Sequence, residues 1–143
     1  MHWRLIPRNK PALFWAVLDA FPEAAHVSLE GDLKQFRLLE RSDASTAETL
    51  VLRRNTLSPR LDFVVLPVSP ELVSTLKQIM SGAGIFNDGD LLIHAQVEFR
   101  GKLVLGAYDN FHEDCVVACE PLGEDFLEPL RTKGILRSYE AIS

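Results

Sequence analysis

The run from Tyr108 to Cys115, with sequence YDNFHEDC, is the densest group of chemically reactive residue types in the chain. It contains three carboxylates, at Asp109, Glu113 and Asp114, and the imidazole of His112. Carboxylates held close together repel one another unless a positive group neutralises them. The run therefore favours a docking surface for a cationic group, a basic protein partner or a metal ion. The competing interpretation is an ordinary turn whose carboxylates point into water.

A strand pair over residues 91–99 and 102–109 positions this run. A three-residue loop that ends at Gly101, with that glycine in the left-handed conformation, suits the connection between the two strands. This loop places Glu98 opposite Lys102, and the two side chains form a favourable ion pair across the strands. The spacing thus predicts a hairpin and a specific register for it.

The same register brings in a second acidic stretch, residues 87–90 with sequence NDGD. It sets Leu91 opposite Asp109 and therefore Asp90 next to Asn110, so that the two acidic loops meet at one end of the sheet. The sequence predicts one acidic binding patch around His112, formed by Asp88, Asp90, Asp109, Glu113 and Asp114.

A hydrolytic enzyme is the alternative interpretation of the same residues. His94, His112 and Asp109 are ligand types that zinc accepts, and Cys115 next to an imidazole could serve as a nucleophile. However, His94 lies about 10 Å along its strand from the open end of the hairpin. Cys115 also opens an apolar strand, which is typical of a core cysteine. These objections favour the binding interpretation.

Other ligand classes find less support. The glycine segments at 82–84 and 101–102 match neither the P-loop nor the dinucleotide fingerprint, so no nucleotide cofactor is expected. Residues 87–90 lack the longer ligand series of a calcium loop, and no metal site is predicted. Basic residues gather in the first half of the chain, where their alternation along strands indicates a solvated sheet face: Lys34, Arg37, Arg41, Arg53, Arg54 and Arg60.

Size and charge set broader limits. A chain of 143 residues is expected to fold as a single domain, residues 1–143, and its net charge of −5 argues against a nucleic-acid-binding protein. No apolar run approaches the roughly 20 residues that span a bilayer, so a cytoplasmic protein without a membrane role is expected. Cys115 and Cys119 would lie about 13 Å apart on one strand, which is too far for a disulfide.

Three helices are predicted. Apolar residues at helical spacing run from Pro11 to Phe21, and Pro22 ends the pattern. Ser69 caps a second helix that begins at Pro70 and ends near Gly82. Phe126, Leu127, Leu130 and Leu136 suggest a third, broken helix that ends at Gly134, with Pro129 in its first turn or at a kink.

Strands account for most of the remaining chain. Residues 25–29 and 34–38 alternate around a Gly31-Asp32 turn and predict a first hairpin. Further strands are expected at 49–54 and 61–66, in addition to the hairpin described above, and a short one at 115–119. The fold class predicted is α+β, with a mainly antiparallel sheet built from hairpins and packed against two or three helices.

The strand at 61–66 is apolar on both faces, which favours a position that is central in the sheet or covered by helices. At an edge it would favour a homo-oligomer. For function, the sequence predicts a small non-enzymatic binding or regulatory protein, of an inhibitor or immunity type. Its acidic patch, with His112, would receive a basic protein partner. The hydrolytic enzyme stays the alternative.

Overall fold

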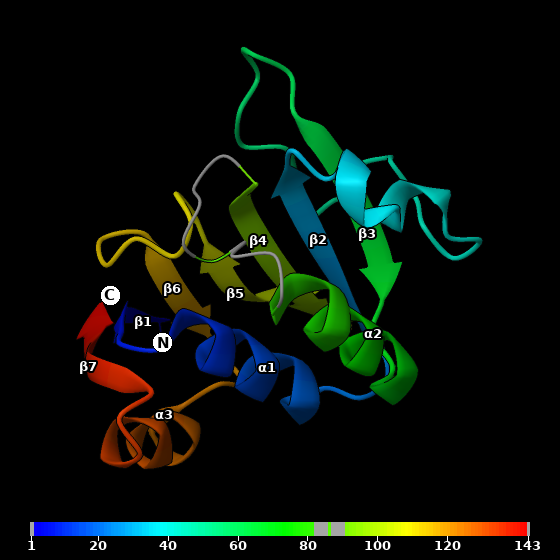
Figure 1. The fold of residues 1–143 in the computed structure, drawn as a ribbon. Coiled ribbons are helices and arrows are strands. Elements are labelled where there is room, and N and C mark those ends of the chain that lie inside the picture. The colour runs from blue at the N-terminus through cyan, green and yellow to red at the C-terminus, as the bar shows by residue number, and fades with distance from the viewer. Residues whose placement is uncertain (1, 82–85, 87–90, 143) are drawn as a thin grey trace.

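The computed structural model describes residues 2–81, 86 and 91–142. All seven strands form one antiparallel sheet in the order β3-β2-β4-β5-β6-β1-β7. The helices α1 and α2 lie across one face of the sheet, and α3 lies beside β7 (Figure 1). The strands are β1 His2–Pro7, β2 Ala25–Gly31, β3 Asp62–Pro67, β4 Leu92–Phe99, β5 Lys102–Ala107, β6 Val116–Cys119 and β7 Leu136–Ile142. The helices are α1 Lys10–Ala20, α2 Pro70–Ser81 and α3 Glu124–Thr132. The predicted α+β class is confirmed.

The predicted helices are confirmed and begin at the residues that cap them. The side chain of Asn9 accepts a hydrogen bond from the Ala12 amide at 3.1 Å, and Ser69 Oγ accepts one from the Leu72 amide at 3.0 Å. α3 starts at Glu124, earlier than predicted, and the chain leaves it through Gly134 with φ of +79°. The helices pack onto the sheet through one core cluster, which includes Phe14, Leu18, Leu72, Leu76, Leu127 and Leu130.

The strands near the two ends of the chain were not predicted. β1 lies between β6 and β7. The ring of Trp3 in β1 contacts the ring of Tyr139 in β7 edge to face, with ring centroids 5.5 Å apart. β1 ends in a proline, and β7 alternates poorly between buried and exposed residues. The alternation that reveals a strand is therefore weak in β7, and in β1 it covers only His2 to Leu5 before the chain reaches Ile6 and Pro7.

The first predicted hairpin is wrong. Residues 34–38 fall in two short 3₁₀ helices, Lys34–Phe36 and Leu38–Glu40, and Gly31 continues β2 instead of turning. β2 pairs with β3 on one side and β4 on the other. Phe36 and Leu38 are buried in the core although they lie in short helical turns. Their alternation with polar residues therefore reflects burial and not a strand.

The predicted strand at 49–54 is also wrong, because residues 46–61 contain no strand. This part of the chain crosses the sheet face opposite the helices, where Leu52 packs against Phe63 and Val65. The strand predicted at 61–66 is β3, and it lies at the edge of the sheet, not in the centre. Ser45 covers that edge at Val65 through two backbone hydrogen bonds of 3.0 and 2.7 Å.

The hairpin of β4 and β5 exists, but its predicted register is wrong. The connection is a two-residue turn, with φ of 51° at Arg100 and 83° at Gly101, so Phe99 pairs with Lys102. A bulge next to Val97 then shifts the register further, and Gln96 lies opposite Gly106. The predicted Glu98–Lys102 pairing does not form, because Leu103 occupies the place opposite Glu98.

No helix within the described residues is long and apolar enough to cross a membrane.

Replacing Gly31 with alanine should destabilise the fold, because β2 passes very close to the next segment of the sheet. A Cβ atom at this position would lie 2.1 Å from the carbonyl oxygen of Leu91, which belongs to the backbone and cannot rotate away. Gly31→Ala is expected to lower the free energy of unfolding by about 1–3 kcal/mol or more. Gly123→Ala, where no atom lies within 4 Å of the added carbon, should cost less than about 1 kcal/mol. Urea unfolding measures the free energy of unfolding of both variants. Equal losses in the two variants would contradict a close approach of Gly31 to the Leu91 backbone.

Candidate functional site

The predicted site residues at 109–114 form an anchored turn between β5 and β6, here called the acidic turn. Asp109, Asn110 and Phe111 all have positive φ, at 52°, 55° and 59°. The Asn110 amide donates to the Ile93 carbonyl at 2.7 Å, and its side-chain amide donates to the Leu92 carbonyl at 2.7 Å. These bonds place Asn110 beside Leu92 and Ile93, whereas the predicted neighbour, Asp90, lies outside the described residues.

The sequence explains why the chain turns in this way. Asp and Asn tolerate the left-handed conformation, but Phe111 does not favour it. Burial compensates, since Phe111 is 1% exposed and meets Phe14 and Phe86 edge to face, with ring centroids 5.7 Å apart in both pairs. Lys10 also donates to the side-chain oxygen of Asn110 at 3.2 Å. The turn is therefore held from α1 as well as from β4.

The carboxylates of this turn face solvent. Asp109, Glu113 and Asp114 are exposed, and no ion pair joins them to a lysine or arginine of the described chain. His112 is exposed too, and its Nδ1 accepts a hydrogen bond from the Asp114 amide at 3.2 Å. The other members of the predicted acidic patch, Asp88 and Asp90, lie outside the described residues. The structure thus brings together Asp109, His112, Glu113 and Asp114.

His94 lies apart from His112, in a buried position on β4. Its Nε2 is 2.8 Å from Thr56 Oγ1, and its Nδ1 accepts a hydrogen bond from the Asp109 amide at 3.3 Å. Burial lowers the pKa of His94, while the nearby charges of Glu30 and Asp109 partly oppose that shift. The ring is therefore neutral, with Nδ1 as the acceptor and Nε2 as the donor to Thr56.

A buried polar layer that the sequence did not reveal extends from His94 across the sheet face opposite the helices. Glu30 lies opposite His94 in the β2–β4 ladder, and Ser28 lies opposite Gln96. All four side chains are at least 93% buried, with exposures of 1% to 7%. The sequence shows that these residues alternate with apolar ones. It does not show which segment of the chain covers them.

That covering segment runs from Arg41 to Leu61 and is fixed to the polar layer by hydrogen bonds. The Glu30 carboxylate accepts from the backbone amides of Asn55 at 2.8 Å and Thr56 at 3.2 Å. Gln96 accepts from the Arg53 amide at 3.1 Å and donates to the Tyr108 hydroxyl at 3.1 Å. Every buried polar side-chain atom of the described residues has a hydrogen-bond partner.

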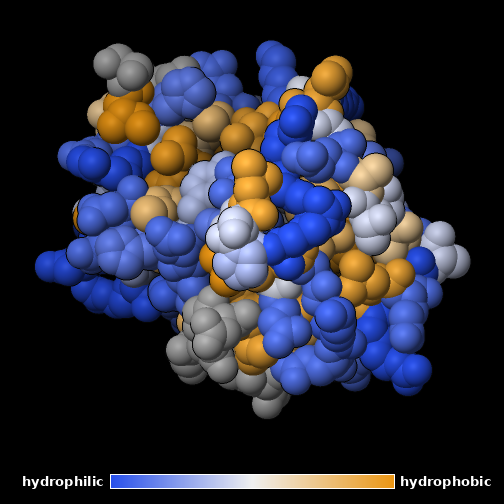
Figure 2. Space-filling view, turned by 90° about the horizontal axis from the view of Figure 1, so that it is seen from above, coloured by the Kyte–Doolittle hydropathy of each residue, from blue (hydrophilic) through white to orange (hydrophobic). Residues whose placement is uncertain are grey.

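The covering segment also displays two large apolar side chains. Leu57 follows the fixed residue Thr56 directly and is 81% exposed, and Leu50 is 96% exposed. Seen from above, the surface is mostly hydrophilic, with separate apolar groups among the polar ones (Figure 2). Single exposed leucines are common on protein surfaces, and these two are accessible to a partner.

The cysteines have different surroundings, and both are free, as predicted. Cys115 Sγ lies 3.7 Å from the Asp109 carboxylate, and burial together with the charges of Asp109 and Asp114 raises the pKa of this thiol. A thiol surrounded by carboxylates, with no imidazole beside it to take its proton, is a poor nucleophile. No imidazole nitrogen of His94 or His112 bonds to Cys115 among the contacts of the described chain.

Within residues 2–81, 86 and 91–142, no three His, Cys, Asp or Glu side chains lie close enough together to share a metal ion. Comparison with known proteins adds no family: no family model, curated protein or solved structure matches the chain. The candidate site therefore has to be interpreted from its own geometry.

His94 should make the stability of the fold depend on pH. Its pKa is lower in the folded protein than the ordinary value of 6.5, so the unfolded chain binds its proton more tightly. The stability that the neutral ring contributes is present above about pH 6.5 and is lost as the pH falls below that value toward the folded-state pKa. Urea unfolding at several pH values between about 5 and 8 should show this loss. His94→Gln should show a smaller slope in that range, and an unchanged slope would contradict the assignment.

Glu30 should hold the covering segment locally. Glu30→Ala removes the acceptor of two backbone amides and is expected to cost about 1–3 kcal/mol. Hydrogen exchange should accelerate at the amides of Asn55 and Thr56, while amides in the β4–β5 ladder keep their protection. Glu23→Ala, at an exposed carboxylate, is the control. Unchanged exchange at the two amides would show that Glu30 does not fix the segment.

Proposed function

We propose that the protein is a non-enzymatic binding protein whose acidic turn contacts a protein partner with a basic surface. The observation that carries this proposal is the state of Asp109, Glu113 and Asp114, which are exposed and unpaired with any lysine or arginine of the described chain. Three like charges within six residues repel one another, and a cationic partner relieves that repulsion. His112 lies in the same turn and adds a donor or acceptor.

Rigidity supports the same conclusion. Binding costs less when the contacting segment is already ordered, because less conformational entropy is lost. Hydrogen bonds from Asn110 to β4 and from Lys10 to Asn110 hold the acidic turn, and buried Phe111 fixes its middle. The carboxylates are therefore carried by a turn that is already ordered.

Exposed ion pairs alone give little affinity, typically about 0–1 kcal/mol each. They increase association rates and select the partner's charge, while apolar contacts supply most of the binding energy. Leu57 is an exposed apolar side chain that can offer such a contact, and it follows Thr56, which bonds to the same His94 ring as the Asp109 amide. The proposed partner has basic residues beside an apolar pocket.

The hydrolytic alternative draws less support from the geometry. Both ring nitrogens of His94 are engaged in hydrogen bonds, and Asp109 meets this ring through its backbone amide, not through its carboxylate. His112 uses Nδ1 within the turn, and the pKa of Cys115 is raised by burial and nearby carboxylates. The predicted residues His94, Asp109, His112 and Cys115 therefore do not supply a base, a nucleophile and an acid at one point.

Within this proposal the protein acts in the cytoplasm, because both of its thiols are unpaired. We do not expect the acidic turn to bind a nucleic acid or a membrane, because the net charge is −5 and the exposed turn is acidic. A homo-oligomer through β3 stays a prediction, although Ser45 already pairs with this edge at Val65.

Charge reversal in the acidic turn tests the proposal. Glu113→Lys/Asp114→Lys changes two exposed carboxylates that make no ion pair within the described chain. The matched control, Glu23→Lys/Asp32→Lys, changes the net charge by the same amount at other exposed positions. Affinity capture from native lysate, followed by binding measurements on each captured partner, compares the wild type with both variants.

Basic partners should be retained by the control and lost by the turn variant, with at least about a tenfold weaker affinity for two reversed charges. The affinity for wild type should also fall as salt is added. Equal binding by both variants, or partners that are not basic, would refute the proposal.

A further inference from the structure

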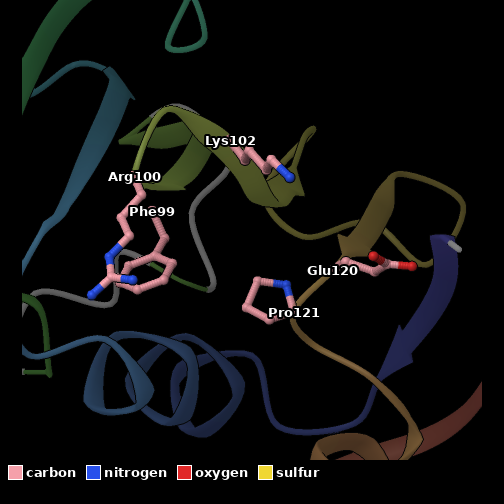
Figure 3. Close-up of a pocket in the computed structure, with 5 residues that line it drawn as sticks. All are labelled: Phe99, Arg100, Lys102, Glu120 and Pro121. Atoms are coloured by element: carbon pink, nitrogen blue, oxygen red, sulfur yellow. The ribbon is translucent and has the colours of Figure 1, made fainter.

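A groove lies at the end of β4 and β5 opposite the acidic turn. The β4–β5 turn forms one side, and the loop after β6 forms the other (Figure 3). Two neighbouring hollows of about 520 and 430 Å³ share Lys102 and Glu120. Each is large enough for a small molecule, because ligand sites in proteins commonly measure about 300–1,000 Å³.

The first hollow combines an apolar wall with cations. Phe99 is held against Phe21, with ring centroids 4.7 Å apart, and faces Pro121 across the groove. The guanidinium carbon of Arg100 lies 4.9 Å from the centre of the Phe99 ring. Lys102 extends from the same turn. A planar apolar group with a negative charge suits this wall.

The second hollow contains a thiol beside an imidazole. Cys119 of β6 pairs with His2 of β1, and both residues line the hollow together with Lys102. Cys119 Sγ lies 3.0 Å from His2 Nδ1. Burial raises the pKa of the Cys119 thiol, and the imidazole nitrogen lies within hydrogen-bond distance of its sulfur.

We propose that this groove binds small anionic disulfides and that Cys119 reacts with them by thiol–disulfide exchange. Lys102 and Arg100 attract the negative group, and Phe99 and Pro121 contact the apolar part. The proposal does not depend on the acidic turn, which lies at the other end of the sheet.

The exchange needs no additional oxidant. His2 Nδ1 takes the proton as Cys119 Sγ attacks one sulfur of the ligand, a new S–S bond forms, and the ligand's own S–S bond breaks. The departing thiolate takes up that proton and leaves as a thiol. Cys119 is oxidised to a mixed disulfide while the departing sulfur is reduced, so atoms and electrons balance.

Cys115 provides an internal comparison. Its nearest charges are the carboxylates of Asp109 and Asp114, which repel an anionic reagent. Cys119 shares its hollow with Lys102 and with one carboxylate, Glu120, whose charge interacts with Lys102. Cys119 should therefore discriminate less against an anionic disulfide than Cys115 does.

The experiment uses single-cysteine variants, Cys115→Ser to retain Cys119 and Cys119→Ser to retain Cys115. Each reacts at low ionic strength with dithiobis(nitrobenzoate), an anionic aromatic disulfide, and with cystamine, a cationic one. Intact-mass spectrometry measures both rates of mixed-disulfide formation. A short cysteine peptide corrects for the intrinsic reactivity of each reagent, and circular dichroism confirms that each variant is folded.

The ratio of anionic to cationic rates should be at least about tenfold higher for Cys119 than for Cys115. Lys102→Gln should lower the Cys119 ratio by about threefold to tenfold, Lys102→Arg should preserve it, and added salt should reduce it. His2→Gln should slow both reagents at Cys119 and leave their ratio unchanged.

Equal ratios for the two cysteines would overturn the proposal, as would a Cys119 ratio that does not respond to Lys102→Gln. Unchanged rates in His2→Gln would remove His2 as the proton acceptor. Glu113→Lys/Asp114→Lys should leave the reaction of Cys119 as it is, which separates this result from the test of the acidic turn.

Discussion

The buried ring of His94 is the contact on which the candidate binding surface depends. One ring nitrogen is bonded to Thr56 in the covering segment, and the other accepts the backbone amide of Asp109 in the acidic turn. Two loops that are more than fifty residues apart in sequence are thus fixed against one rigid strand. This arrangement requires a neutral ring, because Nδ1 can accept a hydrogen bond only when it carries no proton.

The polar layer around His94 replaces the regular structure that the covering segment lacks. A long segment without helix or strand must bond its backbone amides elsewhere, since an unpaired buried amide is costly. Glu30 and Gln96 provide those acceptors from the sheet. Burying these side chains is itself unfavourable, but complete pairing offsets the cost and specifies one position for the segment. Leu57 is consequently displayed by an ordered chain.

Local signals in the sequence predicted the parts of the fold that form locally. Pro11 and Ser69 mark the starts of α1 and α2, and Gly101 marks the β4–β5 turn. Predictions that depend on distant partners failed. Residues 34–38 alternate like a strand, but they cannot pair with β2, because β3 and β4 already occupy both of its edges. Among the described site residues, the acidic turn was predicted from composition, whereas the role of Glu30 could not be, because nothing near it in sequence identifies Asn55 and Thr56 as its partners.

The two ends of β5 differ in charge, and net charge conceals this difference. Lys102 begins the strand beside Arg100, and the chain leaves its other end into Asp109 and the rest of the acidic turn. Because salt at physiological strength screens charges beyond roughly 8 Å, a strand of six residues keeps its two ends electrically independent. A chain with a net charge of −5 therefore carries a group of carboxylates at one end of β5 and the side chains of Arg100 and Lys102 at the other, and neither charge strongly affects the other.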